Sequence, residues 1–194
     1  MKLNLLLTFG LMACSLSSMA GEPVTFIKGD KTIFRGDNSF LVEMDLSTTS
    51  IDALDTEEGF VQYNKGKAKD PEKWENGWKT DKASFLTRYV ETMSRELKKT
   101  SLKVSSDDPD SKYKMILKPD KIHTGTPVRY SSVEMKISVV DMATQEEVAI
   151  LHVADVRGVE WGMMTPTVGM TVSMAMMNSA HVLDKFIKKT LAGK

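Results

Sequence analysis

The sequence predicts a single α+β domain in which an antiparallel or mixed β-sheet carries two helices, packed mainly on one face. Residues 133–140 and 148–156 alternate apolar and polar side chains on either side of a short polar segment, which indicates a β-hairpin. Two further segments, 80–99 and 166–191, have apolar residues at the spacing of amphipathic helices. The length suits one domain with one core.

The first twenty residues are typical of a secretory signal peptide. Lys2 precedes a mostly apolar run over residues 5–13, and the small residues Ser18 and Ala20 stand where a signal peptidase cuts. The run is too short to anchor the chain permanently across a bilayer. We therefore expect residues 1–20 to be removed and the protein to be exported, either to the periplasm or as a secreted protein.

Cys14 leaves one alternative open. Residues 11–14 are close to a bacterial lipobox, whose cysteine would carry a lipid anchor and make the protein an outer-membrane lipoprotein. Cleavage after Ala20 instead leaves residues 21–194 as one domain without cysteine, which excludes disulfides, thiol catalysis and thiolate metal sites. The chain has 26 basic and 26 acidic residues and no basic stripe, so nucleic acid is not an expected partner.

The start of the mature chain alternates short apolar runs with Gly-Asp turn signals. We expect a strand near residues 23–28, a short strand or arm at 31–35, and a longer strand at 39–46. The third strand has one apolar face, formed by Phe40, Val42, Met44 and Leu46.

Residues 47–79 lack sustained periodicity and are predicted to form a long polar loop. The loop contains Trp74 and Trp78, four positions apart among charged residues. The favoured role for this pair is one turn of helix that pins the loop to the core. The alternative is an aromatic contact for a ligand or a partner.

The first helix is expected to begin at a Thr80 or Asp81 cap and to continue through Lys99. Its apolar face comprises Phe85, Leu86, Tyr89, Val90, Met93 and Leu97. Strands are then expected from Leu102 and around residues 113–117, followed by the hairpin, whose turn suits Asp141 as an acceptor for backbone N–H groups.

The last helix is expected to have Thr165 as its cap and Pro166 in its first position, and to end near Leu191. Residues 161–180 carry no formal charge and contain six methionines. Burial between the sheet and the first helix would account for this composition, with Val172 and Leu183 in the core. The alternative is an apolar groove or self-association face, for which Trp161, Met170 and Met174 are the candidate contacts.

The sequence contains no recognisable motif for catalysis, metal binding or phosphate binding. His123, His152 and His181 show no ligand-pair spacing, and no nucleophile motif or phosphate-binding glycine loop occurs. The sequence therefore predicts no metal, no cofactor and no catalytic residue.

Residues 28–34, 78–97, 112–118 and 139–144 resemble a family of uncharacterised exported proteins of Bacteroides-type bacteria. More distantly, the helix, the Tyr-x-x-x-Leu strand, the Val-Val-Asp-x-x-Thr hairpin and the closing helix resemble the amino-terminal domain of the translocation protein TolB and the curli secretion lipoprotein. The resemblance implies a module that binds partners and catalyses nothing. Gln145 departs from this pattern, which usually has glycine there.

We therefore expect a non-catalytic envelope protein that acts as a binding or assembly module, with an envelope protein or a small apolar ligand as its partner. The alternative is a hydrolase with a site under the 47–79 loop. Its acids would be Asp55, Glu57 and Glu58, although no base or nucleophile is paired with them in the sequence.

Overall fold

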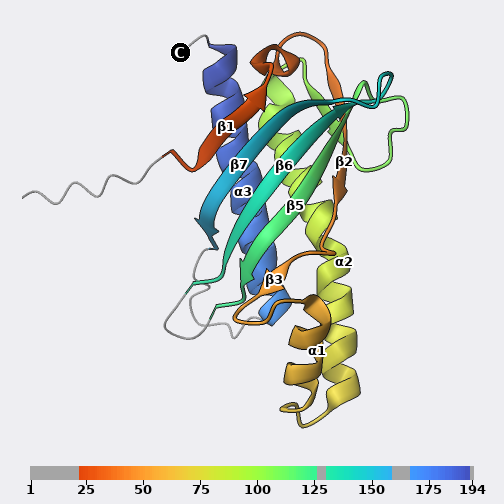
Figure 1. Cartoon of the computed structure of the whole chain (residues 1–194), viewed down its shortest axis with the longest axis vertical. Coiled ribbons are helices and arrows are strands. Elements are labelled where there is room, and N and C mark those ends of the chain that lie inside the picture. Colours follow the sequence, from red (N-terminus) through yellow and green to blue (C-terminus); the bar gives the residue numbers. More distant parts are fainter. Residues whose placement is uncertain (1–21, 126–129, 159–166, 193–194) are drawn as a thin grey trace, which may run out of the picture.

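The computed structural model describes residues 22–125, 130–158 and 167–192, and it confirms the α+β class (Figure 1). In chain order the elements are β1 (Val24–Gly29), the 3-10 helix η1 (Lys31–Phe34), β2 (Ser39–Met44), β3 (Ser50–Ile51), α1 (Glu57–Lys65), α2 (Pro71–Glu96), the 3-10 helix η2 (Leu97–Lys99), β4 (Lys103–Ser105), β5 (Tyr113–His123), β6 (Ser132–Asp141), β7 (Glu147–Arg157) and α3 (Val168–Leu191).

The strands form one mixed sheet in the order β1-β7-β6-β5-β2-β4, and the short β3 pairs with β5 beyond this path. Strands β5, β6, β7 and β1 are successively antiparallel. Strand β2 instead lies parallel to both β5 and β4, and β3 is parallel to β5. The sheet is therefore mixed, one of the two arrangements that the sequence left open.

The predicted hairpin is confirmed as β6 and β7. Every second residue of β6 from Val133 to Val139 is fully buried, so one face of the hairpin belongs to the core. In the turn, Asp141 Oδ1 accepts hydrogen bonds from the backbone N–H groups of Ala143 and Thr144. Gln145 has a φ of 59°, in the left-handed region that favours glycine.

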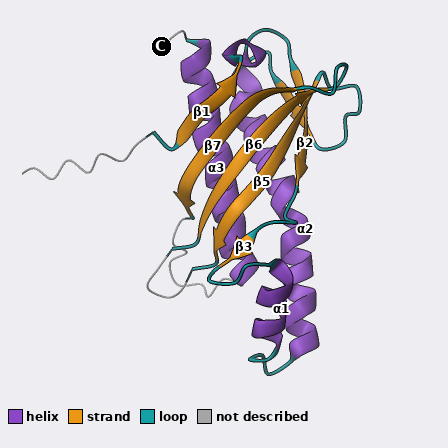
Figure 2. Cartoon of the chain, viewed as in Figure 1, coloured by secondary structure: helices purple, strands orange, loops and turns teal. Residues whose placement is uncertain are grey.

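Helices α2 and α3 lie side by side against one face of the sheet, with α3 behind β7 and β6 and α2 behind β2 and β4 (Figure 2). They run in the same direction, because residue 81 of α2 meets residue 167 at the start of α3 and residue 96 meets residue 181. The core between sheet and helices contains fully buried residues from both layers, among them Phe40, Met115, Leu117, Met135, Phe85, Tyr89, Met93, Val172 and Leu183.

The predicted polar loop at residues 47–79 and the predicted number of two helices are wrong. This segment contains β3, α1 and the first part of α2, so the described residues form three α-helices. Thr56 caps α1 by accepting a hydrogen bond from the N–H of Gly59, and Asp70 caps α2 in the same way through Lys73. Pro71 occupies the first turn of α2, where proline is tolerated.

Two smaller expectations are also corrected. Helix α2 begins at Pro71 and not at a Thr80 or Asp81 cap. Residues 31–35 form no strand, because Lys31–Phe34 is a 3-10 helix whose first turn Asp30 caps. Helix α3 is capped by Thr167, whose side chain accepts from the N–H of Met170. The expected cap at residues 165 and 166 lies outside the described residues.

Candidate functional site

The sheet face opposite α2 and α3 is uncovered within the described residues (Figure 2). We call it the open face. On β2, β5, β6 and β7 it carries four aliphatic side chains that stay out of the core between sheet and helices. They are Leu41 on β2, Ile116 on β5, Val140 on β6 and Ile150 on β7.

Register places these aliphatic side chains diagonally to one another on neighbouring strands, and none lies directly opposite another. Ile116 pairs with Ser138, which in turn pairs with Ile150, and Leu41 and Val140 both pair with Lys114. Ile150 is only 9% exposed although none of the described helices covers it, so its neighbours on the strands already shield it. Antiparallel strands with a wetted face usually carry polar residues at such positions, so this apolar strip is unexpected there.

Charged pairs lie within and beside the apolar strip. Lys114 lies 2.9 Å from Glu43, and Lys118 lies 3.8 Å from Asp45. On the other side, His152 Nε2 lies 2.9 Å from Glu134 Oε1. Register places Lys114 between Leu41 and Val140, and Glu43 opposite Ile116, so the face alternates aliphatic and charged side chains.

A second feature is a groove of about 640 Å³ between the end of β2, the start of α1 and the middle of α2. It lies where the sequence placed a hydrolase site. Glu57 and Glu58 are on its wall, whereas Asp55 does not line it. No hydrogen-bonded pair of nucleophile and base is present among the residues that line it.

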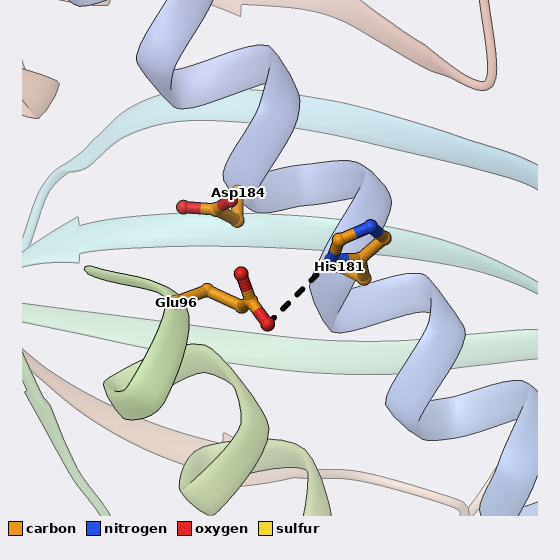
Figure 3. Close-up of side chains that lie close together, drawn as sticks. All are labelled: Glu96, His181 and Asp184. Atoms are coloured by element: carbon orange, nitrogen blue, oxygen red, sulfur yellow. Dashed lines mark ion pairs between the residues drawn. The ribbon is translucent and has the colours of Figure 1, made fainter. Parts of the chain in front are cut away.

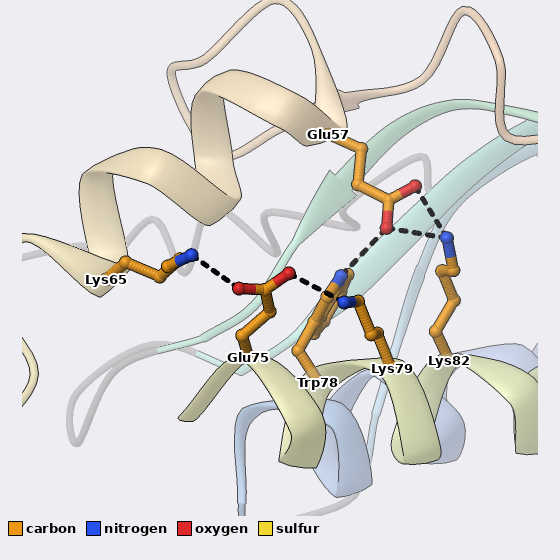
Figure 4. Close-up of polar contacts among 6 residues, drawn as sticks. All are labelled: Glu57, Lys65, Glu75, Trp78, Lys79 and Lys82. Carbon is orange, nitrogen blue, oxygen red and sulfur yellow. Dashed lines mark hydrogen bonds and ion pairs between the residues drawn. The ribbon is translucent and has the colours of Figure 1, made fainter. Parts of the chain in front are cut away.

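The side chain of Glu57 is already engaged (Figure 4). Its Oε1 accepts a hydrogen bond of 2.9 Å from the indole Nε1 of Trp78, and Lys82 Nζ lies 2.9 Å from Oε2. Nearby, Glu75 is held between the ammonium groups of Lys65 and Lys79. Hydrogen bonds from Lys65, then from Lys79, lower the pKa of Glu75 to about 2. These contacts join α1 to α2, so they serve the fold.

Both tryptophans of the predicted loop belong to the same contact. Trp78 is 4% exposed, and its ring centroid lies 5.0 Å from that of Phe60 on α1. Trp74 is half-buried, stacks on Trp78 at 6.5 Å and lies 5.8 Å from Phe60. This cluster buries Phe60, the one side chain of α1 that is buried, and agrees with the predicted pinning role.

The remaining candidate contacts are not brought to this cluster. Met170 and Met174 lie one turn apart on α3 and are half-buried. Trp161 lies outside the described residues. As expected, Val172 and Leu183 of the same helix are fully buried. The sequence missed the open face, because Leu41, Ile116 and Ile150 look like ordinary strand residues until the sheet is assembled.

None of the helices in the described ranges combines the length and the apolar composition that crossing a membrane requires.

Comparisons with known proteins give a distant likeness in structure alone. No family model and no curated protein matches the sequence. Among solved structures, the chain is similar to a PelC dodecamer from Paraburkholderia phytofirmans, with a TM-score of 0.43 and 13% identity over 83% of this chain and 96% of that one. A dodecamer of a PelC point variant from the same organism gives a TM-score of 0.41 and 13% identity over 83% of this chain and 93% of that one.

Proposed function

We propose that this protein is a non-catalytic, exported component of the cell envelope that binds another envelope protein through its open face. The observation that carries the proposal is the apolar strip of Leu41, Ile116, Val140 and Ile150 on a sheet face that no described helix covers. The resemblance of the sequence to exported envelope modules supports the same class of function.

The physical argument concerns the shape and the charge of the face. A helix or strand of a partner lying across β5, β6 and β7 would bury Ile116 and the exposed parts of Val140 and Ile150. Burial of apolar surface is favourable by roughly 25 cal/mol per Å². The opposite charges of Lys114 with Glu43 and of His152 with Glu134 would then contact the partner beside the aliphatic side chains. Charged groups across an interface set orientation and association rate more than affinity. A flat face of this kind suits a protein partner better than a small molecule, which needs a concave site.

Site-specific photocrosslinking in the native host tests the proposal. A photoreactive amino acid is placed at Ile116 or Lys136 on the open face, and at Glu91 on the exposed side of α2 or Lys185 on α3 as matched controls. We expect one envelope protein to be crosslinked from both open-face positions and from neither control. Equal crosslinking from all four positions, or none from the open face, would contradict the proposal.

Export is tested separately by the intact mass of the protein purified from its host. Cleavage after Ala20 gives an unmodified amino terminus at Gly21, which is the expected result. An acylated terminus at Cys14 would instead make the protein a lipoprotein, and full-length protein in the cytoplasm would rule out an envelope role.

The groove beside α1 supports hydrolysis as a second candidate function, because its volume is that of a ligand site and two carboxylates line it. Of these, Glu58 is exposed and free of the contacts that hold Glu57. If the groove is an active site, Glu58→Gln should abolish hydrolysis of model ester, phosphate and glycoside substrates without changing the melting temperature. We expect no such activity in the wild-type protein.

A further inference from the structure

Three side chains that can bind a metal ion meet where α2 ends beside the middle of α3. Glu96 is the last residue of α2, and His181 and Asp184 lie three positions apart on α3. One ligand atom from each residue lies within 4.8 Å of those of the other two (Figure 3). None of the three belongs to the open face or to the groove beside α1.

Asp184 is the unusual member of this cluster. Its side chain is 2% exposed, and its Oδ2 accepts a 2.9 Å hydrogen bond from Lys188 one turn later. Its other oxygen, Oδ1, is buried and accepts no hydrogen bond from any described residue. Leaving a buried carboxylate oxygen without a partner is costly, so such an atom calls for an explanation. A cation at Oδ1 would supply the missing partner.

The other two ligands are placed to complete such a site. His181 Nδ1 lies 3.8 Å from Glu96 Oε1, which is too long for a hydrogen bond. Tetrahedral bonds of 2.0–2.2 Å to a metal separate the ligand atoms by roughly 3.3–3.6 Å. His181 and Glu96 are 44% and 27% exposed, so their side chains can rotate by the small amount required. The same exposure gives an ion a path from solvent.

A comparison within the molecule shows what distinguishes this cluster. His123 pairs with Asp52 at 3.8 Å and His152 pairs with Glu134 at 2.9 Å, yet neither pair has a third ligand among the described residues. Within the same ranges of the chain, only the pair of His181 and Glu96 has a buried carboxylate beside it. The position also suits a cation because Glu96 stands at the carboxyl end of α2, where the helix dipole is negative. Arg95, 3.8 Å from Glu96, is exposed and can turn away.

We propose that Glu96, His181 and Asp184 bind a zinc ion that ties the end of α2 to α3. One imidazole and two carboxylates form a donor set that suits zinc, whereas calcium and magnesium prefer oxygen ligands alone. Zinc also binds such nitrogen and oxygen sites more tightly than manganese or ferrous iron. Three protein ligands leave the fourth position of the tetrahedron to water.

The test is metal titration of the protein purified from its exporting host and stripped with a chelator. Zinc binding is followed by calorimetry, and cobalt, which replaces zinc, by its visible absorption. The variants are His181→Ala and Glu96→Gln, both at partly exposed positions, together with Asp184→Asn. His152→Ala is the matched control, because it removes a histidine from a histidine–carboxylate pair that has no third ligand among the described residues.

We expect one zinc ion per chain and a higher melting temperature with zinc, since a ligand that binds only the folded state stabilises it. His181→Ala and Glu96→Gln should each weaken binding at least about tenfold, and His152→Ala should leave it unchanged. If Asp184→Asn does not fold, the two partly exposed variants decide the question. The proposal is overturned if the wild type binds no zinc, if His152→Ala weakens binding as much as His181→Ala, or if calcium binds more tightly.

Discussion

The indole Nε1 of Trp78 donates a 2.9 Å hydrogen bond to Oε1 of Glu57, and so joins the middle of α2 to the first turn of α1. The same indole lies against Phe60. Helix α1 is nine residues long, too short to be stable alone in water, so its stability depends on this contact.

Removing the indole should therefore destabilise the protein more than removing the charge. Trp78→Ala is expected to cost about 3–5 kcal/mol because it leaves a cavity beside Phe60. Glu57→Gln keeps an oxygen for the indole N–H and loses only the partly exposed ion pair with Lys82, which is worth at most about 1 kcal/mol. Urea unfolding measures both, with the exposed Glu58→Gln as control. Equal losses for Trp78→Ala and Glu58→Gln would show that the contact does not stabilise the fold.

Acid should weaken a second contact between α1 and α2, the ion pair of Lys65 with Glu75. Lys65 and Lys79 lower the pKa of Glu75 to about 2, from an ordinary value of 4.5. Because the folded pKa is the lower one, the stabilisation is complete above pH 4.5 and is lost as the pH falls towards 2. The difference in unfolding free energy between wild type and Glu75→Gln should be constant above about pH 5 and shrink towards pH 2. A difference that grows in acid would contradict the assignment.

Two glycines in helices should respond to alanine in opposite ways. A Cβ at Gly169 would lie 2.0 Å from the Cβ of Asp81, at the point where α3 passes α2, whereas a Cβ at Gly77 would meet open space. Gly77→Ala should stabilise the protein by about 1 kcal/mol, the difference in helix propensity. Gly169→Ala should lower the melting temperature, since the two helices must separate. Thermal melts decide, and a stabilising Gly169→Ala would mean that the helices are farther apart.

The hairpin turn gives a prediction about Gln145, whose φ is 59°. Left-handed backbone costs an L-residue about 1–2 kcal/mol, and most for β-branched side chains. Gln145→Gly should therefore be more stable than Gln145→Val by at least about 1 kcal/mol, even though both lose the hydrogen bond from Gln145 Nε2 to the carbonyl of Met142. Chemical denaturation of the two variants makes the comparison. Equal stabilities would place Gln145 outside the left-handed region.

The core face of α3 is tested by one buried and one half-buried residue. Val172 is fully buried, so Val172→Asp should place an unpaired charge in the core at a cost of several kcal/mol, comparable with the stability of a whole domain. Met174 is half-buried, and Met174→Asp should fold and melt at a lower temperature than wild type. Thermal melts beside size-exclusion chromatography separate the two. A normally melting Val172→Asp protein would mean that the core face lies elsewhere on the helix.

The sequence alone determined the elements whose pattern of apolar residues is regular. Strands β6 and β7, the apolar positions of β2 and β5, and the buried residues Val172 and Leu183 follow from a period of two or of 3.6, which is a property of neighbouring residues. The α+β class follows from the same patterns, because strands and helices with one apolar face must cover each other.

Only the tertiary structure decided the rest, because it depends on which distant segments meet. Helix α1 and the first turns of α2 are polar in sequence and become stable when Phe60, Trp74 and Trp78 bury one another. The parallel pairing of β2 with β5 decides which side chains of these two strands are neighbours on the open face. Glu96 meets His181 and Asp184 because α2 and α3 run side by side, and no spacing within either helix predicts a contact between them.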